Sequence, residues 1–178
     1  KEAHMKRYEV FPGHAGSPLQ MAEFEPAALG DRQVAVAIKA VSLNYRDILV
    51  GQNTYFCPIN DGLVPCSDGA GEVVAVGKDV RGLKVGDRVA TLFFPNWQGG
   101  RADGDSLAGA LGAEGGGVLT ERFVAEESGL IKLPDSLSYS AAATLSCAAL
   151  TAWNSLFEAG DLKPGQTVLL LGTGGVSI

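Results

Sequence analysis

The sequence has few of the residues that bind metals or form cross-links. It contains three cysteines and two histidines, and no two cysteines form a C-x-x-C pair. An odd number of cysteines without a secretion signal favours reduced thiols, so we expect a cytoplasmic protein without disulfides. His14 has no partner pattern, and we expect it to be a solvated surface residue. His4 belongs to KEAH, which is typical of an expression tag, so we take the natural protein to begin at Met5.

Positive charge and long apolar runs are also scarce. The formal net charge is -6 at pH 7. Nucleic acids and anionic membranes bind basic surfaces, and this composition offers none. No apolar run approaches the roughly 18 residues that span a bilayer. The sequence therefore predicts neither a nucleic-acid partner nor a membrane partner.

Glycine, in contrast, is abundant, and it separates short segments with the alternation of β-strands. The chain has 24 glycines. In QVAVAIKAVSLN, the period-two alternation places Val34, Val36 and Ile38 on one side of a strand. A series of short strands with glycine turns predicts a partly open barrel or sandwich between Met5 and Pro134. Further strands are expected in GEVVAVG, LKVGDRVATLF, LTERFVAEE and GLIKLP, and one short helix in YRDILVGQ.

A long glycine-rich and acid-rich loop interrupts this pattern at residues 94–118. Loops of this length are either functional lids or mobile surface segments. We expect a mobile surface loop, with a lid as the alternative.

The character of the sequence changes after Pro134. Alanines, leucines and aromatic residues recur at helical spacing, with Ser138 as a suitable N-cap and Gly160 as a helix terminator. The continuous apolar run TVLLL then predicts a strand buried on both faces of a parallel sheet. We therefore divide the chain into residues 5–134 and residues 135–178.

The last residues combine this expected strand with a glycine-rich turn. Gly172, Gly174 and Gly175 match G-x-G-x-x-G, with Ser177 at the position of its third glycine. The first glycine permits a sharp turn, and the second lets a pyrophosphate approach the backbone. A small third residue allows the following helix to pack closely, which serine also permits. The motif predicts a dinucleotide site, and a plain strand-to-turn glycine cluster is the alternative.

Five motifs in order resemble those of the medium-chain dehydrogenase/reductase superfamily. They are LNYRDILVGQ, VPCSDGAGEVVAVG, LKVGDRV, LSCAALTAW and LKPGQTVLLLGTGGVS. The resemblance covers nearly all of the chain from Met5 onwards. It implies a mostly β GroES-like catalytic domain, joined to the first edge (helix, strand and glycine-rich turn) of an α/β Rossmann coenzyme domain. It also implies NAD or NADP as the cofactor.

The zinc ligands of the alcohol dehydrogenases in that superfamily are largely replaced. Asn44 stands at the position of the first cysteine, Ser67 at that of the histidine, and only Cys147 remains. Catalytic zinc normally has three protein ligands, so we expect no zinc. A rescue set of Cys66, Asp68 and Cys147 is the alternative.

The chain then looks most similar to the zinc-independent quinone oxidoreductases. By this resemblance, Asn44 lies beside the nicotinamide, and Asp47 orients the same segment. Tyr45 and Tyr55 are expected to line the substrate cleft, although Tyr55 serves equally well as a core or surface residue. Ser67 is expected to point into the space that zinc would occupy.

Cys147 and Thr151 are four residues apart and share one face of an unbroken helix. The resemblance places Thr151 near the nicotinamide. No histidine is available to activate Cys147, so we expect a packed, neutral thiol.

The sequence as a whole predicts an oxidoreductase that transfers a hydride between NAD(P)H and a quinone, enone or related carbonyl compound without zinc. One alternative is an alcohol dehydrogenase with an atypical zinc site. Another is an inactive GroES-like fragment that acts only in binding, and we expect these 178 residues alone to be inactive. A homodimer, formed through the remainder of the coenzyme domain, is the family's usual assembly.

Overall fold

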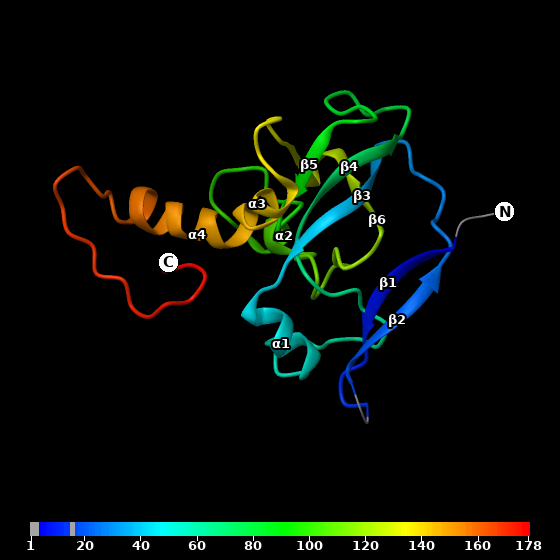
Figure 1. Ribbon diagram of the computed structural model, residues 1–178, viewed down its shortest axis with the longest axis horizontal. Coiled ribbons are helices and arrows are strands. Elements are labelled where there is room, and N and C mark those ends of the chain that lie inside the picture. The colour runs from blue at the N-terminus through cyan, green and yellow to red at the C-terminus, as the bar shows by residue number, and fades with distance from the viewer. Residues whose placement is uncertain (1–3, 15–16) are drawn as a thin grey trace.

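The computed structural model describes residues 4–14 and 17–178 (Figure 1). The residues taken as a tag before His4 lie outside this description. In this described part of the chain, seven strands form two antiparallel sheets, short helices interrupt them, and the longest helical segment follows the last strand. Within the described residues, no helix combines the length and the apolarity needed to cross a bilayer.

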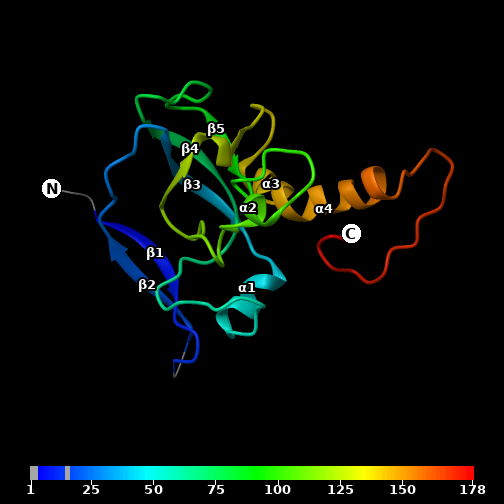
Figure 2. The ribbon, with the colours of Figure 1, turned by 180° about the vertical axis from the view of Figure 1, so that it is seen from behind.

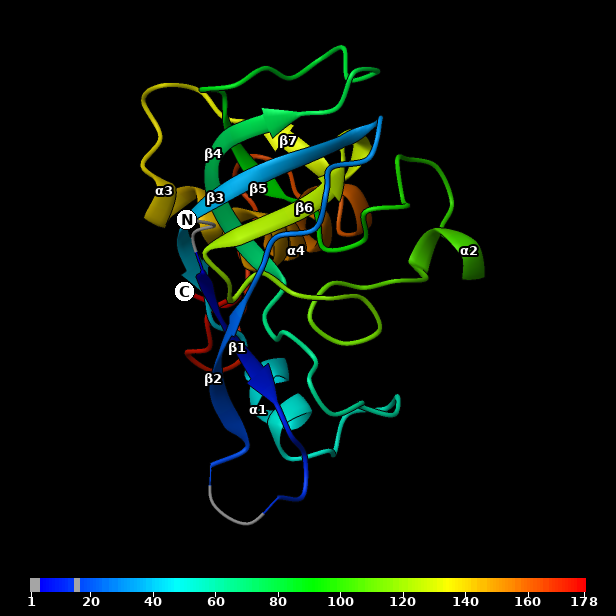
Figure 3. The same cartoon turned by 90° about the vertical axis from the view of Figure 1, so that its right-hand side faces the viewer.

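The larger sheet has five strands in the order β6-β3-β4-β5-β7, and every neighbouring pair is antiparallel. The sheet is curled: Figure 3 shows β3, β4 and β6 curving around an interior. This confirms the mostly β, partly open barrel expected from the sequence. The strands are β3 (Gln33–Ser42), β4 (Asp68–Val76), β5 (Arg88–Thr91), β6 (Arg122–Glu126) and β7 (Leu130–Lys132).

A two-stranded hairpin lies beside this sheet. It consists of β1 (Met5–Val10) and β2 (Leu19–Phe24), and no specific sequence signal pointed to it. It is joined to the loop region through the isolated bridges of Arg7 with Thr120 and of Val10 with Leu63. At its tip, His14 is exposed and its Nε2 lies 3.1 Å from Asp61 Oδ2, which confirms the expected surface histidine.

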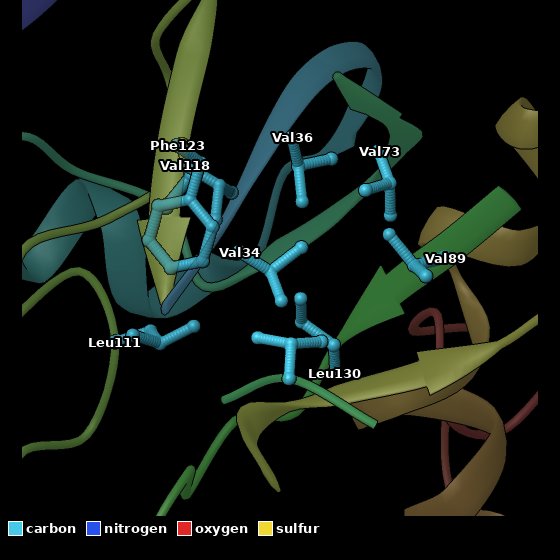
Figure 4. Packing of buried hydrophobic residues seen from close by; sticks show 10 residues of the cluster. Val34, Val36, Val73, Val89, Leu111, Val118, Phe123 and Leu130 are labelled. Carbon is cyan, nitrogen blue, oxygen red and sulfur yellow. The ribbon is translucent and has the colours of Figure 1, made fainter. Parts of the chain in front are cut away.

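Valine side chains fill the interior of the curled sheet. Val34 and Val36 are fully buried, as the alternation predicted, and Ile38 packs partly buried against the same cluster. Figure 4 shows side chains from opposite strands pointing toward one another. Burying one such side chain contributes about 1.5–3 kcal/mol. The rest of the buried cluster is Cys66, Val73, Val80, Val89, Leu111, Val118, Phe123 and Leu130.

The expected short helix is present as α1 (Tyr45–Gly51), directly after β3. Its start is fixed by Asp47, because the Asp47 Oδ2 atom accepts a hydrogen bond from the Asn44 backbone N–H at 2.8 Å. The negative charge of Asp47 in the first turn also suits the positive end of the helix dipole. This bond uses the backbone N–H of Asn44 and not the Nδ2 of its side chain.

The glycine-rich loop at residues 94–118 is only partly a surface loop. It carries the short helix α2 (Gly104–Leu107), which is solvent-exposed on most of its surface. Its second half is packed: a Cβ atom at Gly112 would stand 2.6 Å from the backbone of Cys66, and one at Gly117 would stand 2.2 Å from the Pro65 carbonyl oxygen. The expectation of a mobile surface loop is therefore wrong for residues 110–118.

The 3-10 turn η1 (Glu127–Gly129) leads directly into β7. A long helical segment follows β7. Ser138 caps the segment, since its Oγ accepts a hydrogen bond from the Ala141 N–H at 3.2 Å, as predicted. The segment extends away from the sheet (Figure 2). It alternates between α and π geometry in α3 (Tyr139–Ala143), η2 (Leu145–Ala149), α4 (Leu150–Trp153) and η3 (Asn154–Ala159).

The strand expected at residues 167–171 is not formed. These residues have no regular structure, and Leu169 and Leu171 are each 83% exposed. A strand needs a neighbour to pair its backbone groups and bury its side chains, and the described residues offer none here. The prediction of a buried strand at residues 167–171 is therefore wrong in this structure.

Candidate functional site

The candidate site centres on the buried carboxylate of Asp68, at the start of β4. Asp68 is 1% exposed. Its Oδ2 accepts a hydrogen bond from Asn44 Nδ2 at 2.8 Å, and its Oδ1 accepts one from Ser67 Oγ at 3.0 Å. Asn44 and Ser67, which the resemblance placed at zinc-ligand positions, are thus tied to one carboxylate.

The backbone beneath this network is held rigidly. Thr91 Oγ1, on β5, donates to the Ser67 carbonyl oxygen at 2.9 Å and accepts from the Gly69 N–H at 3.0 Å. Cys66 has a φ of +68°, a left-handed conformation that is strained for a residue with a side chain. Ser67 is fully buried and its hydroxyl is occupied by Asp68, so it does not point into open space.

Burial dominates the electrostatics of the site. It raises the pKa of Asp68, while hydrogen bonds from Asn44 and Ser67 and the positive charge of Arg46 oppose that rise. Burial also raises the pKa of the Cys66 thiol to about 12, with a further rise from the Asp47 carboxylate. The thiol of Cys66 is therefore protonated at neutral pH and is not a nucleophile.

Cys147, in η2, approaches the same cluster from the helical segment. Burial raises the pKa of its thiol first, and the Asp68 carboxylate raises it further. A side-chain hydrogen bond with Thr151 lowers it. The unbroken helix assumed for this pair is not present, because Cys147 lies in the π-helical η2 and Thr151 in α4. A neutral, packed Cys147 is what the lack of a nearby histidine predicted.

Arg46 is a site residue that the sequence reasoning missed. Its Cζ lies 4.4 Å from the ring centroid of Phe93 and 5.8 Å from that of Tyr55. Its Nη2 also donates to the Leu111 carbonyl oxygen. The residue lies inside the NYRD motif, so its position next to Asp47 was the available signal.

The two tyrosines of the predicted cleft are placed differently. Tyr45 is 74% exposed at the start of α1. Tyr55 is half-buried, packs against the small cluster of Val10, Val50 and Ile59, and faces Arg46. The ring of Phe56 lies 4.3 Å from that of Tyr55. Tyr55 is therefore close to the charged cluster, whereas Tyr45 faces solvent.

The glycine-rich turn is separate from this cluster. Gly172 has a φ of +83°, and a Cβ atom at Gly172, Gly174 or Gly175 would meet nothing within 4 Å. The Ser177 N–H donates to the Gly174 carbonyl oxygen at 2.8 Å, and the Ser177 hydroxyl donates to the Leu171 carbonyl oxygen, so the turn is held by local hydrogen bonds. The open backbone fits the approach of a pyrophosphate, which is the requirement of the motif.

Possible metal ligands do not gather in the described residues. Within residues 4–14 and 17–178, no group of three or more histidine, cysteine, aspartate or glutamate side chains is arranged to hold a metal ion. The rescue set of Cys66, Asp68 and Cys147 is thus not assembled as a ligand group. The three cysteines, including Cys57, are free thiols.

A cavity of about 380 Å³ borders the candidate site only through Leu111, whose carbonyl oxygen accepts from Arg46. Arg7 of β1, Phe24 of β2, residues 116–117 and the whole of β6 line it. None of the residues predicted for catalysis or coenzyme binding belongs to its lining.

This curled antiparallel sheet, with polar residues gathered where β3 and β4 meet α1, defines a GroES-like catalytic domain. The model of the alcohol dehydrogenase GroES-like domain matches residues 30–135. The chain belongs to the medium-chain dehydrogenase/reductase superfamily, as its motifs indicated.

The relatives carry names from two branches of that superfamily. A zinc-type alcohol dehydrogenase-like protein of Schizosaccharomyces pombe is 42% identical over 96% of this chain and 51% of its own length. A quinone oxidoreductase of Pseudomonas aeruginosa is 34% identical over 90% of this chain and 43% of its own length. The chain therefore spans about half the length of these relatives.

Solved structures share the fold over the same portion. A Sinorhizobium meliloti 1021 protein described as an alcohol dehydrogenase superposes with a TM-score of 0.89 and 38% identity, covering 99% of this chain and 53% of its own. A Pseudomonas syringae quinone oxidoreductase superposes with a TM-score of 0.67 and 34% identity, covering 90% and 43%.

Proposed function

We propose that this chain provides the catalytic domain of an oxidoreductase that reduces a quinone, an enone or a related carbonyl compound with NAD(P)H and without zinc. The observation that carries the proposal is the Asn44–Asp68–Ser67 network. Asn44 and Ser67 use their polar atoms to bind one carboxylate, which supports a site that works without zinc. The relatives named as quinone oxidoreductases support the substrate class.

In this proposal the chain's residues bind and orient the reactants. The backbone of Gly172, Gly174 and Gly175, with Ser177, holds the pyrophosphate, and Asn44 and Thr151 lie beside the nicotinamide. When bound, the coenzyme supplies the hydride. Asp68 fixes the Asn44 amide, and Asp47 fixes the helix start that carries it, so this segment is positioned before the reactants arrive.

Tyr45 and Tyr55 complete the substrate side of the site. Tyr55, which is half-buried beside Arg46, is the better placed hydrogen-bond donor. Tyr45 is exposed and offers an aromatic surface for stacking on a planar substrate. A small-molecule carbonyl or quinone is the proposed partner.

We also propose that the boundary between the two parts of the enzyme lies at residues 134–135. Residues 5–134 then form the catalytic domain, and residues 135–178 belong to the coenzyme domain, through which a homodimer forms. Because residues 167–171 are unpaired and exposed, the 178 residues alone are proposed to bind coenzyme weakly and to be inactive.

The experiment combines metal analysis with isotope transfer. The protein is prepared with a coenzyme domain that brings it to the length of its relatives, and it is purified without chelators. The first measurement is the amount of zinc bound per chain. The second is the transfer of deuteride from 4-deuterated NADH and NADPH to a quinone. Deuterium in the product with far less than one zinc per chain supports the proposal. Stoichiometric zinc that is required for transfer contradicts it and favours an atypical alcohol dehydrogenase, the alternative suggested by the name of the Schizosaccharomyces pombe relative.

A further inference from the structure

Arg46 connects the segments that surround the candidate site. Its guanidinium faces the ring of Phe93, which follows β5, and the ring of Tyr55, which follows α1. It also donates from Nη2 to the carbonyl oxygen of Leu111, in the packed half of the 94–118 loop. One side chain of α1 thus holds three other segments in place.

The remaining donors of this guanidinium have no acceptor. Nε and Nη1 of Arg46 are both buried, and neither has a hydrogen-bond partner among the described residues. Leaving a buried donor unpaired costs about 1–3 kcal/mol, and more where the group is charged. An acceptor that reached these donors would remove that cost.

The surroundings favour a neutral acceptor over an anion. Arg46, Asp47 and Asp68 all act electrostatically on the Cys66 thiol, so one positive charge shares this region with two carboxylates. A further anion would be repelled by both carboxylates. A carbonyl oxygen carries no net charge on arrival and gains negative charge only as the carbonyl is reduced.

We propose that the Nε–H and Nη1–H donors of Arg46 receive the carbonyl oxygen of the substrate. The inference rests on the proposed function for the reaction. As hydride from the reduced nicotinamide forms a C–H bond at the substrate, the π-electron pair moves onto the oxygen. Arg46 stabilises that oxygen and keeps its own protons, and a proton from water completes the reduction.

The side of Tyr55 is the entrance for this oxygen. The Tyr55 ring lies farther from the guanidinium than the Phe93 ring, at 5.8 Å compared with 4.4 Å. Residues 54–60 form neither a helix nor a strand, and Phe56 beside Tyr55 is 82% exposed. The oxygen reaches the buried donors as this ring moves aside.

The test observes the donor directly and needs no coenzyme. The chain is labelled with ¹⁵N-arginine, and the Arg46 Nε–H resonance is assigned by its loss in Arg46→Lys. Acetophenone is then titrated, with ethylbenzene as the matched compound that lacks a carbonyl. We expect the resonance to shift with acetophenone alone. Arg46→Met should weaken acetophenone binding at least about 10-fold, since a charged hydrogen bond is lost, whereas Arg101→Met, at an exposed loop position, should not.

Other results would overturn the proposal. Equal shifts with both compounds, or no shift with acetophenone, would show that Arg46 does not receive the oxygen. Because the wild-type titration is sufficient, a failure of Arg46→Met to fold leaves this test decisive. If the enzyme transfers deuteride but the Arg46 Nε–H resonance does not shift, only the role of Arg46 is rejected. If the resonance shifts but no deuteride is transferred, only the proposed function is rejected.

Discussion

Two apolar, glycine-containing segments of this chain have opposite fates. In β4, Val73 is fully buried, and a Cβ atom at Gly71 would stand 2.2 Å from the Ala37 carbonyl oxygen of β3. In residues 167–175, Leu169 is 83% exposed, and a Cβ atom at Gly174 would meet nothing within 4 Å. Both segments have β-forming composition, but only β4 has strands on each side. Neighbours, rather than composition, decide whether such a segment folds.

The largest expected difference concerns the two glycines. Gly71→Ala should destabilise the protein by about 3 kcal/mol or more, because the added carbon forces β4 away from β3. Gly174→Ala should change the free energy of unfolding by less than about 0.5 kcal/mol. Urea unfolding followed by circular dichroism measures both values. Similar losses in the two variants would mean that the turn is packed.

A core deletion gives a smaller contrast of the same kind. Val73→Ala should cost about 2 kcal/mol, from lost apolar burial and a residual cavity. Val168→Ala, at a residue 41% exposed, should cost less than about 0.5 kcal/mol. Thermal unfolding of the two variants makes the comparison, and a larger loss for Val168→Ala would contradict it.

The polar network should show itself in the dependence of stability on pH. The folded protein raises the pKa of Asp68 above its ordinary value, so the folded state holds this proton more tightly than the unfolded state. Asp68 therefore contributes its full stabilisation at pH values below its pKa in the unfolded state, about 3.9. This contribution is lost as the pH rises through the pKa of Asp68 in the folded state. Asp68→Asn should remove that loss while weakening the bonds of Asn44 and Ser67.

Unfolding curves between pH 3 and pH 8 test this expectation. The stability of the wild type relative to Asp68→Asn should fall as the pH rises and then level off. Because the other carboxylates are common to both proteins, their contributions cancel. A difference that rises with pH would contradict the direction of the Asp68 shift.

The smallest expected effect on stability belongs to the exposed leucines. Replacing Leu169 and Leu171 by serine should leave the free energy of unfolding within about 0.5 kcal/mol. The same change should raise the highest concentration at which the chain is still monomeric, since exposed apolar surface promotes self-association. Light scattering over a concentration series measures this. If the serine variant associated as strongly as the wild type, another surface would be responsible for the association.

Much of the sheet could be predicted because its information is local. Alternation identified the side of β3 that carries Val34 and Val36, and glycine turns separated the other strands. The failure at residues 167–171 has a different origin: the apolar pattern was present, but the partner strands that it requires are not among the described residues. The packed half of the 94–118 loop was missed because its contacts with Cys66 depend on tertiary structure.

The candidate site was predictable only in part. The motifs marked Asn44 and Ser67 as replaced ligands, but they did not indicate that both would bind Asp68. The separation of 24 positions between Asn44 and Asp68 hides that bond from any local pattern. Arg46 was overlooked because its importance depends on Phe93 and Leu111, which come from distant parts of the chain.

The π geometry of η2 lengthens the helical segment without turning its downstream face. A residue in a π turn advances less around the axis than the roughly 100° of an α residue, so the wider turn absorbs about one extra residue. Deleting a single residue of η2 after Cys147 would restore α geometry and leave the downstream face nearly in place. Thr151 would then follow Cys147 by three residues, a spacing that still keeps both on one side of the helix. The segment can therefore change its length by one residue at this turn without changing which of its side chains lie together.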